Sequence, residues 1–322
     1  MTIERKMFIN IMKLIKKDKK SVFYLIYYAL IEAILLLSIP LAASFIINSV
    51  LAHAEISVFV LGFIVILSFL LVIFLKVLQE YIVENFQQKI FVNTAIEIME
   101  LACDLKVNSS ESEGNKEQKE TLDRYMNYFF DVTSIQKVFP NILLDGAGLV
   151  MKVVVSLVLL FIFNTTLFVS GLVIFALYLI LLVYLGKGGI DCAIKRSDAK
   201  HKSIYYLQNI FEVDKTREEI LKDYDGYLNE FVQARKNSFN IIIRQLTLTF
   251  FTEGVIVSGF LILGGLLVIN GTLPIGEFVA AEIIVVSIGY ALKIFVKQID
   301  YIYDMIEGFY KLDKLSGTLG NN

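Results

Sequence analysis

The sequence predicts an all-α integral membrane protein with six transmembrane helices, and three observations support this prediction. First, 56% of the 322 residues are hydrophobic and 19% are charged, whereas soluble domains are roughly 45–50% apolar and about a quarter charged. Second, the apolar residues gather in six blocks long enough for a helix of about 20 residues to cross a bilayer. Third, Lys and Arg are absent from three short connections between the blocks. The six expected spans are Val22–Ile47, Ile56–Leu78, Val138–Phe163, Leu167–Leu185, Leu246–Ile269 and Ile275–Val296.

The composition excludes several other classes of protein. An aromatic content of 13% and only 3 prolines exclude a disordered chain. Two distant cysteines, Cys103 and Cys192, cannot build a disulfide framework, and two histidines are too few for a metal cluster. A net charge of −2 without a basic domain argues against nucleic-acid binding. We therefore expect the lipid bilayer as the environment of this chain, and no metal or cofactor on the chain itself.

The distribution of Lys and Arg predicts the orientation in the membrane. Seven of the 30 lie in Met1–Lys20, six in Gln79–Lys137, eleven in Gly186–Arg244 and four in Leu292–Asn322. Cytoplasmic connections carry the excess of positive charge, so we expect both termini in the cytoplasm of a cell with this chain in its plasma (inner) membrane. Met1–Lys20 has no cleavage site of the A-x-A kind, and we interpret it as a retained amphipathic elbow helix that lies flat on the inner membrane surface.

Two long inner segments are expected to form helical hairpins. Both mix apolar residues with charged ones and hold few breakers, which favours helices that continue the spans into the cytoplasm. About 25 helical residues reach roughly 37 Å below the membrane. The expected domain of six helices covers residues 21–315, with inner hairpins at about 79–137 and 186–244 and a tail at 316–322. Within the hairpins, helices are expected at Gln79–Leu105, Lys119–Phe139, Gly186–Tyr206 and Tyr224–Arg244, with a turn at Asn108–Asn115.

Two stretches of sequence resemble the transmembrane domain of ABC exporters. Phe260–Ser287 (FLILGGLLVINGTLPIGEFVAAEIIVVS) is similar to the connection between spans 5 and 6 in the type I secretion and peptide-exporting branch of that family. Leu207–Glu219 (LQNIFEVDKTREE) resembles the second inner loop, although Asn209 stands where the family usually has Gly. The pattern of six spans, minute outer loops and long inner hairpins is also that of the exporter domain.

The resemblance implies an ATP-driven exporter that works as a dimer, with a second copy or with a similar membrane subunit. The motor motif G-x-x-x-x-G-K-[ST] does not occur in the sequence. We therefore expect this chain to be no enzyme, and ATP and Mg to bind a separate nucleotide-binding ATPase subunit. The resemblance favours a peptide or protein as cargo, and a periplasmic adaptor would fit such a system.

The resemblance also implies that the hairpin tips dock on the ATPase. Tyrosines beside basic residues suit a docking surface, since tyrosine is common among interface anchors. The alternative is a solvated loop whose tyrosines pack on the neighbouring helix. The candidate docking residues are Asn108, Glu113 and Gln118 in the first hairpin, and Tyr205, Tyr206, Leu207, Gln208 and Asn209 in the second.

Charged residues within the expected spans are the remaining candidates. A charge at the bilayer centre costs at least about 2.5–3.5 kcal/mol, so it should face the bundle interior or water. Either these residues line a polar translocation path, or Lys152 pairs with an acidic residue and locks the bundle. Asp145 lies seven residues before Lys152 and should share its helix face. The set comprises Glu32, Asp145, Lys152, Glu253 and Glu282.

Two functions of other classes remain open at this point. A secondary transporter could use the membrane-embedded Lys and Glu residues for ion coupling, and such folds carry broken helices near the midplane. Pro40 is a candidate for such a break in the first span. The other alternative is a membrane scaffold that has an exporter fold but transports nothing.

Overall fold

The computed structural model describes residues 18–109, 115–306 and 308, and these residues are helical apart from short connections. The expected elbow helix and the tail at 316–322 therefore lie outside the described residues, except for the last part of the elbow region. The elements are α2 (Lys19–Leu36), α3 (Ser38–Leu51), α4 (Glu55–Ser109), α5 (Asn115–Phe163), α6 (Thr165–Leu185), α7 (Gly189–Gln208), the 3-10 turn η1 (Ile210–Glu212), α8 (Arg217–Ile269) and α9 (Ile275–Lys297). A further helical stretch at 299–306 follows α9.

Six helical segments of the described residues are long and apolar enough to cross a membrane, which confirms the expected number of spans. Their outer surfaces are apolar: Phe59, Phe63 and Phe74 on α4 are largely exposed, as expected of side chains that face lipid. The chain is thus a multi-pass membrane protein. The segments are Lys19–Leu51, Ile56–Asn93, Pro140–Phe163, Thr165–Gln208, Arg217–Ile269 and Ile275–Ile306.

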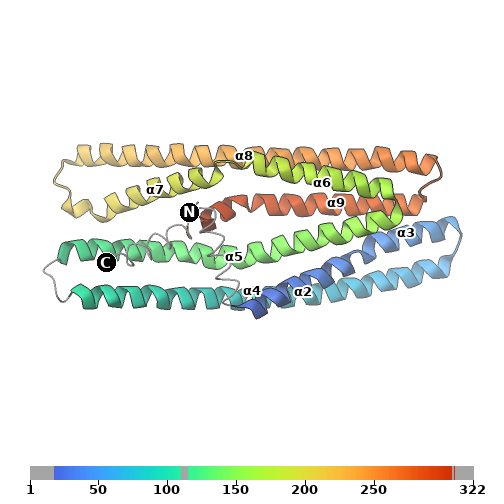
Figure 1. Cartoon of the computed structure of the whole chain (residues 1–322), viewed down its shortest axis with the longest axis horizontal. Helices are drawn as coiled ribbons and strands as arrows, with labels where there is room; N and C mark the ends of the chain where they lie inside the picture. The colour runs from blue at the N-terminus through green and yellow to red at the C-terminus, as the bar shows by residue number, and fades with distance from the viewer. Residues whose placement is uncertain (1–17, 110–114, 307, 309–322) are drawn as a thin grey trace.

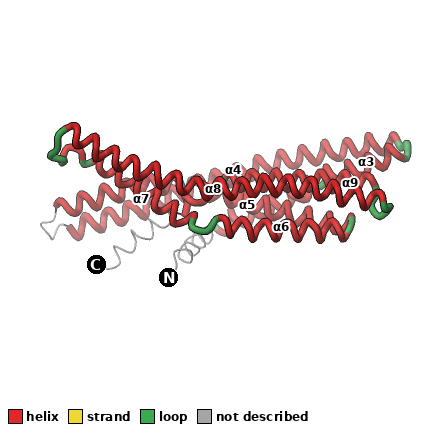
Figure 2. The backbone as a smooth tube through the Cα atoms, turned by 90° about the horizontal axis from the view of Figure 1, so that it is seen from above, coloured by secondary structure: helices red, strands yellow, loops and turns green. Residues whose placement is uncertain are grey.

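The molecule has two different ends (Figure 1). The three short connections, α3 to α4, α5 to α6 and α8 to α9, lie at one end. The α4–α5 hairpin and the α7–α8 hairpin extend toward the other end, and their tips diverge from one another (Figure 2). This arrangement follows from helix length, because α4, α5 and α8 have 55, 49 and 53 residues, far more than the roughly 20 that a bilayer needs.

Helix α9 is the most buried of the six spans and lies at the centre of the bundle. It packs against α3, α5 and α8. Small residues permit this close packing, as is common in membrane helices. A Cβ atom on Gly276 would lie only 2.4 Å from the carbonyl oxygen of Ser44 on α3, so any larger residue there would push α3 away from α9.

The first span consists of two helices rather than one. α2 ends at Leu36, Leu37 is the connecting residue, and α3 begins at Ser38. Pro40 has no N–H group, so the turn before it cannot make a regular helical hydrogen bond. The N–H groups of Leu37 and Leu41 still find the carbonyls of Ile34 and Leu37, at 3.1 and 3.2 Å.

The expectation that span 4 runs straight into the second hairpin is wrong. α6 ends at Leu185 and α7 begins at Gly189, and Gly188 between them has φ 81°. This left-handed conformation is accessible to glycine at little cost. The break also lets the backbone approach Tyr303, because a Cβ on Gly189 would lie 2.3 Å from the Tyr303 hydroxyl.

The other hairpin helices are present and longer than expected. α4 ends at Ser109 and α5 begins at Asn115, so the first tip agrees with the expected turn. α5 continues through Pro140 as one helix. α8 begins at Arg217, seven residues before the expected Tyr224, because Thr216 and Glu219 form a capping box: the Glu219 carboxylate accepts from the Thr216 N–H at 3.0 Å, and the Thr216 hydroxyl accepts from the Glu219 N–H at 3.4 Å.

The two ends of the molecule lead to a topology prediction. In a background in which Cys103 and Cys192 are replaced, Ala52→Cys should react with a membrane-impermeant maleimide on intact cells, because it follows α3 at the end with the short connections. Asp214→Cys, at the tip of the second hairpin, should react only after lysis. Labelling of position 214 in intact cells, with position 52 protected, would show that the orientation is the reverse.

Candidate functional site

The tip of the second hairpin is a compact structure between α7 and α8. Tyr206 is half-buried, with its ring centroid 5.1 Å from that of Tyr227 and 6.2 Å from that of Tyr224 on α8. Its hydroxyl donates to Asp223 at 3.5 Å. Tyr206 therefore holds the two helices of the hairpin together, which agrees with the alternative proposed for these tyrosines.

The connection from α7 to α8 is held by polar contacts. Lys215 donates to Asp223 at 2.6 Å, and this hydrogen bond raises the pKa of Lys215. Asn209 caps the end of α7, and its side-chain amide donates to the Tyr205 carbonyl at 2.9 Å. Its φ of −99° is negative, so the backbone here does not require the glycine that the exporter family usually has.

The residue that protrudes most from the tip is one that sequence reasoning missed. Phe211, on the 3-10 turn η1, is 99% exposed, and Leu207 is 54% exposed. A fully exposed phenylalanine at a polar, capped turn is an apolar group without intramolecular packing. Tyr205 and Gln208 are also exposed but make contacts of their own.

The candidates in the first hairpin cannot be assessed in the same way. Asn108 and Gln118 lie in α4 and α5, but only their backbone is described. Glu113 lies outside the described residues.

A polar cavity lies within the membrane part, between α2, α4, α5 and α9. Its volume is about 250 Å³. Glu32, Asp145 and Lys152 all line it, which confirms that Asp145 and Lys152 share a face of their helix. The structure adds three polar lining residues that were not among the candidates: Lys76, Gln79 and Glu80.

The charges of the spans do not pair as the locking hypothesis requires. Glu32 pairs with Lys76, with Nζ to Oε1 at 3.6 Å, and Asp145 accepts a hydrogen bond from Gln298. Glu253 on α8 pairs with Lys293 on α9 at 2.8 Å. Among the described residues, Lys152 forms no ion pair with any of these carboxylates. One carboxylate oxygen of Glu282 is buried without a hydrogen-bond partner in the described part of the chain, and Glu282 does not line the cavity.

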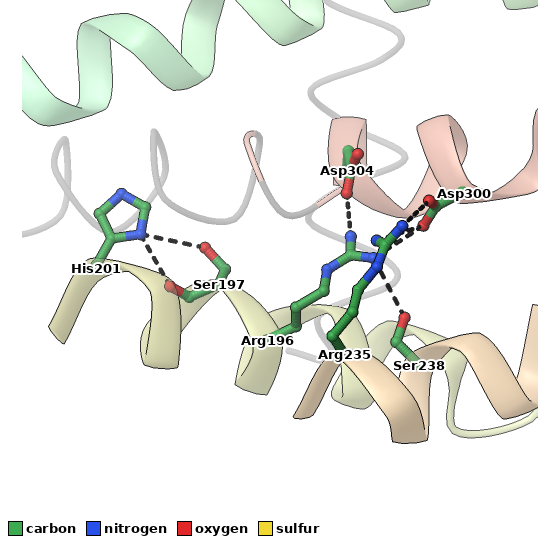
Figure 3. Close-up of polar contacts among 7 residues, drawn as sticks. All are labelled: Arg196, Ser197, His201, Arg235, Ser238, Asp300 and Asp304. Atoms are coloured by element: carbon green, nitrogen blue, oxygen red, sulfur yellow. Dashed lines mark hydrogen bonds and ion pairs between the residues drawn. The ribbon is translucent and has the colours of Figure 1, made fainter. Parts of the chain in front are cut away.

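A cluster of four charged residues joins the second hairpin to the stretch after α9 (Figure 3). Arg196 on α7 is only 5% exposed; it donates to Asp300 at 2.8 Å and also binds Asp304. Arg235 on α8 binds the second oxygen of Asp300 at 2.9 Å. The cluster therefore fixes α7 and α8 to residues 299–306. Sequence reasoning missed it because the sixth span was expected to end at Val296; the i, i+4 spacing of the two aspartates was the available signal.

Comparison with known proteins does not identify a family. Neither protein-family models nor curated protein sequences match the chain. Its interpretation therefore depends on the arrangement described above.

The charged cluster generates a prediction about stability. Arg196→Met should cost about 3–5 kcal/mol of unfolding free energy, because it leaves two carboxylates with one arginine in a buried site. Arg235→Met should cost about 1 kcal/mol or less, because Arg235 is 45% exposed and Arg196 still holds Asp300. Reversible unfolding in mixed micelles measures both; equal effects of the two variants would contradict the assigned burial.

Proposed function

We propose that this chain is the membrane-spanning subunit of an ATP-driven exporter of the ABC type. It forms half of a translocation path and couples to an ATPase, which the 322 residues do not contain. The observation that carries the proposal is the tip of the second hairpin: a rigid, polar turn that presents one fully exposed Phe211 at the end of a continuous 53-residue helix.

The local contacts suit a surface that receives force. A docking element must keep its shape when a partner moves, and the tip is braced by the stacked Tyr206, the Lys215–Asp223 hydrogen bond and the capping box at Thr216. An exposed aromatic side chain in a polar rim is the usual form of an interface anchor. Phe211 and Leu207 are thus the docking groups, whereas Tyr206 supports them from within the hairpin.

The remainder of the chain suits the transmission of this force. α8 runs without a break from the tip to the opposite end of the molecule (Figure 1). The Arg196 cluster ties the hairpin to the end of the sixth span. When ATP and Mg bind two ATPase subunits, the hairpins of a dimer would approach each other, and the spans would alternate between inward-open and outward-open states.

The cargo of this exporter would pass along the polar cavity between α2, α4, α5 and α9. The resemblance to the type I secretion branch favours a peptide or protein cargo, released on the outer side with or without a periplasmic adaptor. A homodimer or a heterodimer with a similar subunit completes the path.

The proposal predicts that Phe211→Ala reduces co-purification of the ATPase or uncouples its hydrolysis from cargo by about tenfold, as expected when an anchor worth more than 1 kcal/mol is truncated. Phe239→Ala is the matched control, because it removes the same exposed side chain from the flank of α8. Mild-detergent purification followed by cargo-stimulated ATPase assays in liposomes measures both variants. A wild-type chain that binds no ATPase from its own cell would refute the exporter.

A secondary transporter is the second candidate, and a specific observation favours it. The first span is broken at Leu37, and the membrane-embedded Glu32, Lys76 and Lys152 lie at the cavity beside this span. Broken helices next to buried charges are typical of ion-coupled carriers. Transport in liposomes distinguishes the two: an exporter needs ATP, and a carrier stops when a protonophore or sodium ionophore removes the ion gradient.

A further inference from the structure

The cavity between α2, α4, α5 and α9 has an imbalance of charge at the residues placed deepest in the membrane. Lys76 and Lys152 bring two ammonium groups to it, and Glu32 is the carboxylate they share. Asp145 does not restore the balance: it lies two helical turns, or about 10 Å, from Lys152 along α5, and Gln298 already donates to it. This part of the cavity therefore holds one positive charge more than negative.

A second observation points to the same kind of missing partner. Gln79 is 3% exposed and lines the cavity, and its side-chain N–H₂ group has no hydrogen-bond partner among the described residues. Buried amide donors are almost always satisfied. An ammonium group and an amide N–H₂ at one cavity both bind an oxygen acceptor, and the excess charge selects an anionic one.

We propose that this cavity binds an oxyanion, held by Lys152 and by the Gln79 amide, with Lys76 and Glu32 setting its charge. A carboxylate of the cargo or the phosphate of a lipid headgroup would supply the same chemistry. A volume of about 250 Å³ corresponds to roughly eight water molecules at about 30 Å³ each, so the site takes a group the size of one amino acid. The inference rests on the proposed transport function for its biological role, although binding itself needs neither ATP nor an ATPase.

The experiment compares two small probes that differ in charge. N-acetyl-leucine carries a carboxylate, and N-acetyl-leucinamide is its neutral analogue of nearly the same size. Calorimetry with the purified full chain in neutral detergent should show the acid binding at least about tenfold more tightly than the amide, since a hydrogen bond to a charged group is worth more than a neutral one. Equal binding of the two probes, or binding of neither, would overturn the proposal.

Variants test the charge count directly. Lys152→Gln should remove the preference for the acid, and Gln79→Leu should weaken it. Glu32→Gln should strengthen binding of the acid, because the cavity then carries two uncompensated positive charges, and a damaged fold cannot imitate this gain. The double variant Glu253→Gln with Lys293→Gln is the control: it neutralises an ion pair on α8 and α9 outside the cavity and should change nothing. Weaker binding in Glu32→Gln would overturn the proposal.

Nanodiscs distinguish the two sources of the oxyanion. If phosphatidylglycerol, but not phosphatidylcholine, competes with N-acetyl-leucine, the site takes an anionic lipid; if neither competes, it takes a soluble carboxylate. Both outcomes retain the oxyanion site. Loss of ATPase binding with intact probe binding would instead refute the exporter and leave the site standing.

Discussion

The absence of water from the hydrocarbon core is the constraint on which this structure depends. Each backbone N–H and C=O group there must find a partner within the chain, so the apolar segments fold as helices and the helices run far beyond the bilayer before they turn. The breaks obey the same rule. At Leu37 the neighbouring N–H groups find carbonyls three or four residues back, and at Gly186–Gly188 the Gly189 N–H reaches the Gly186 carbonyl at 3.0 Å.

The same constraint organises the charged side chains. Glu253 and Lys293 neutralise each other between α8 and α9, and Arg196 is matched by two aspartates where the sixth span continues below its apolar part. Only the cavity of Lys152 departs from this neutrality among the described residues. Since neutral pairing is possible elsewhere in the same bundle, the departure identifies this cavity as the place where the bundle has room for something that the chain does not itself supply.

Much of the fold could be predicted from the sequence, because hydropathy over 20 residues reports directly on a bilayer. The number of spans and the two inner hairpins follow from it. What could not be predicted depends on contacts between distant segments. Gly188 looks like any glycine until Gly189 meets Tyr303, and Lys293 was counted with the cytoplasmic tail although its partner Glu253 lies within the membrane. Phe211 was overlooked because a single aromatic residue in a polar turn has no periodicity, and its importance lies in the lack of any packing around it.

The second hairpin is connected to the membrane by two unlike helices. α8 is continuous through 53 residues, whereas α6 and α7 meet at a three-residue joint with Gly188 in the left-handed conformation. A displacement of the tip would therefore travel along α8 as along a stiff rod, and the joint would absorb the difference in path between the two sides. With a pivot at Ser238, where Arg196 contacts α8 at 3.4 Å, the arm from Ser238 to Ile269 is about 47 Å long. A tilt of about 5° would then sweep the outer end of the helix through about 4 Å, which is close to the width of an extended peptide backbone.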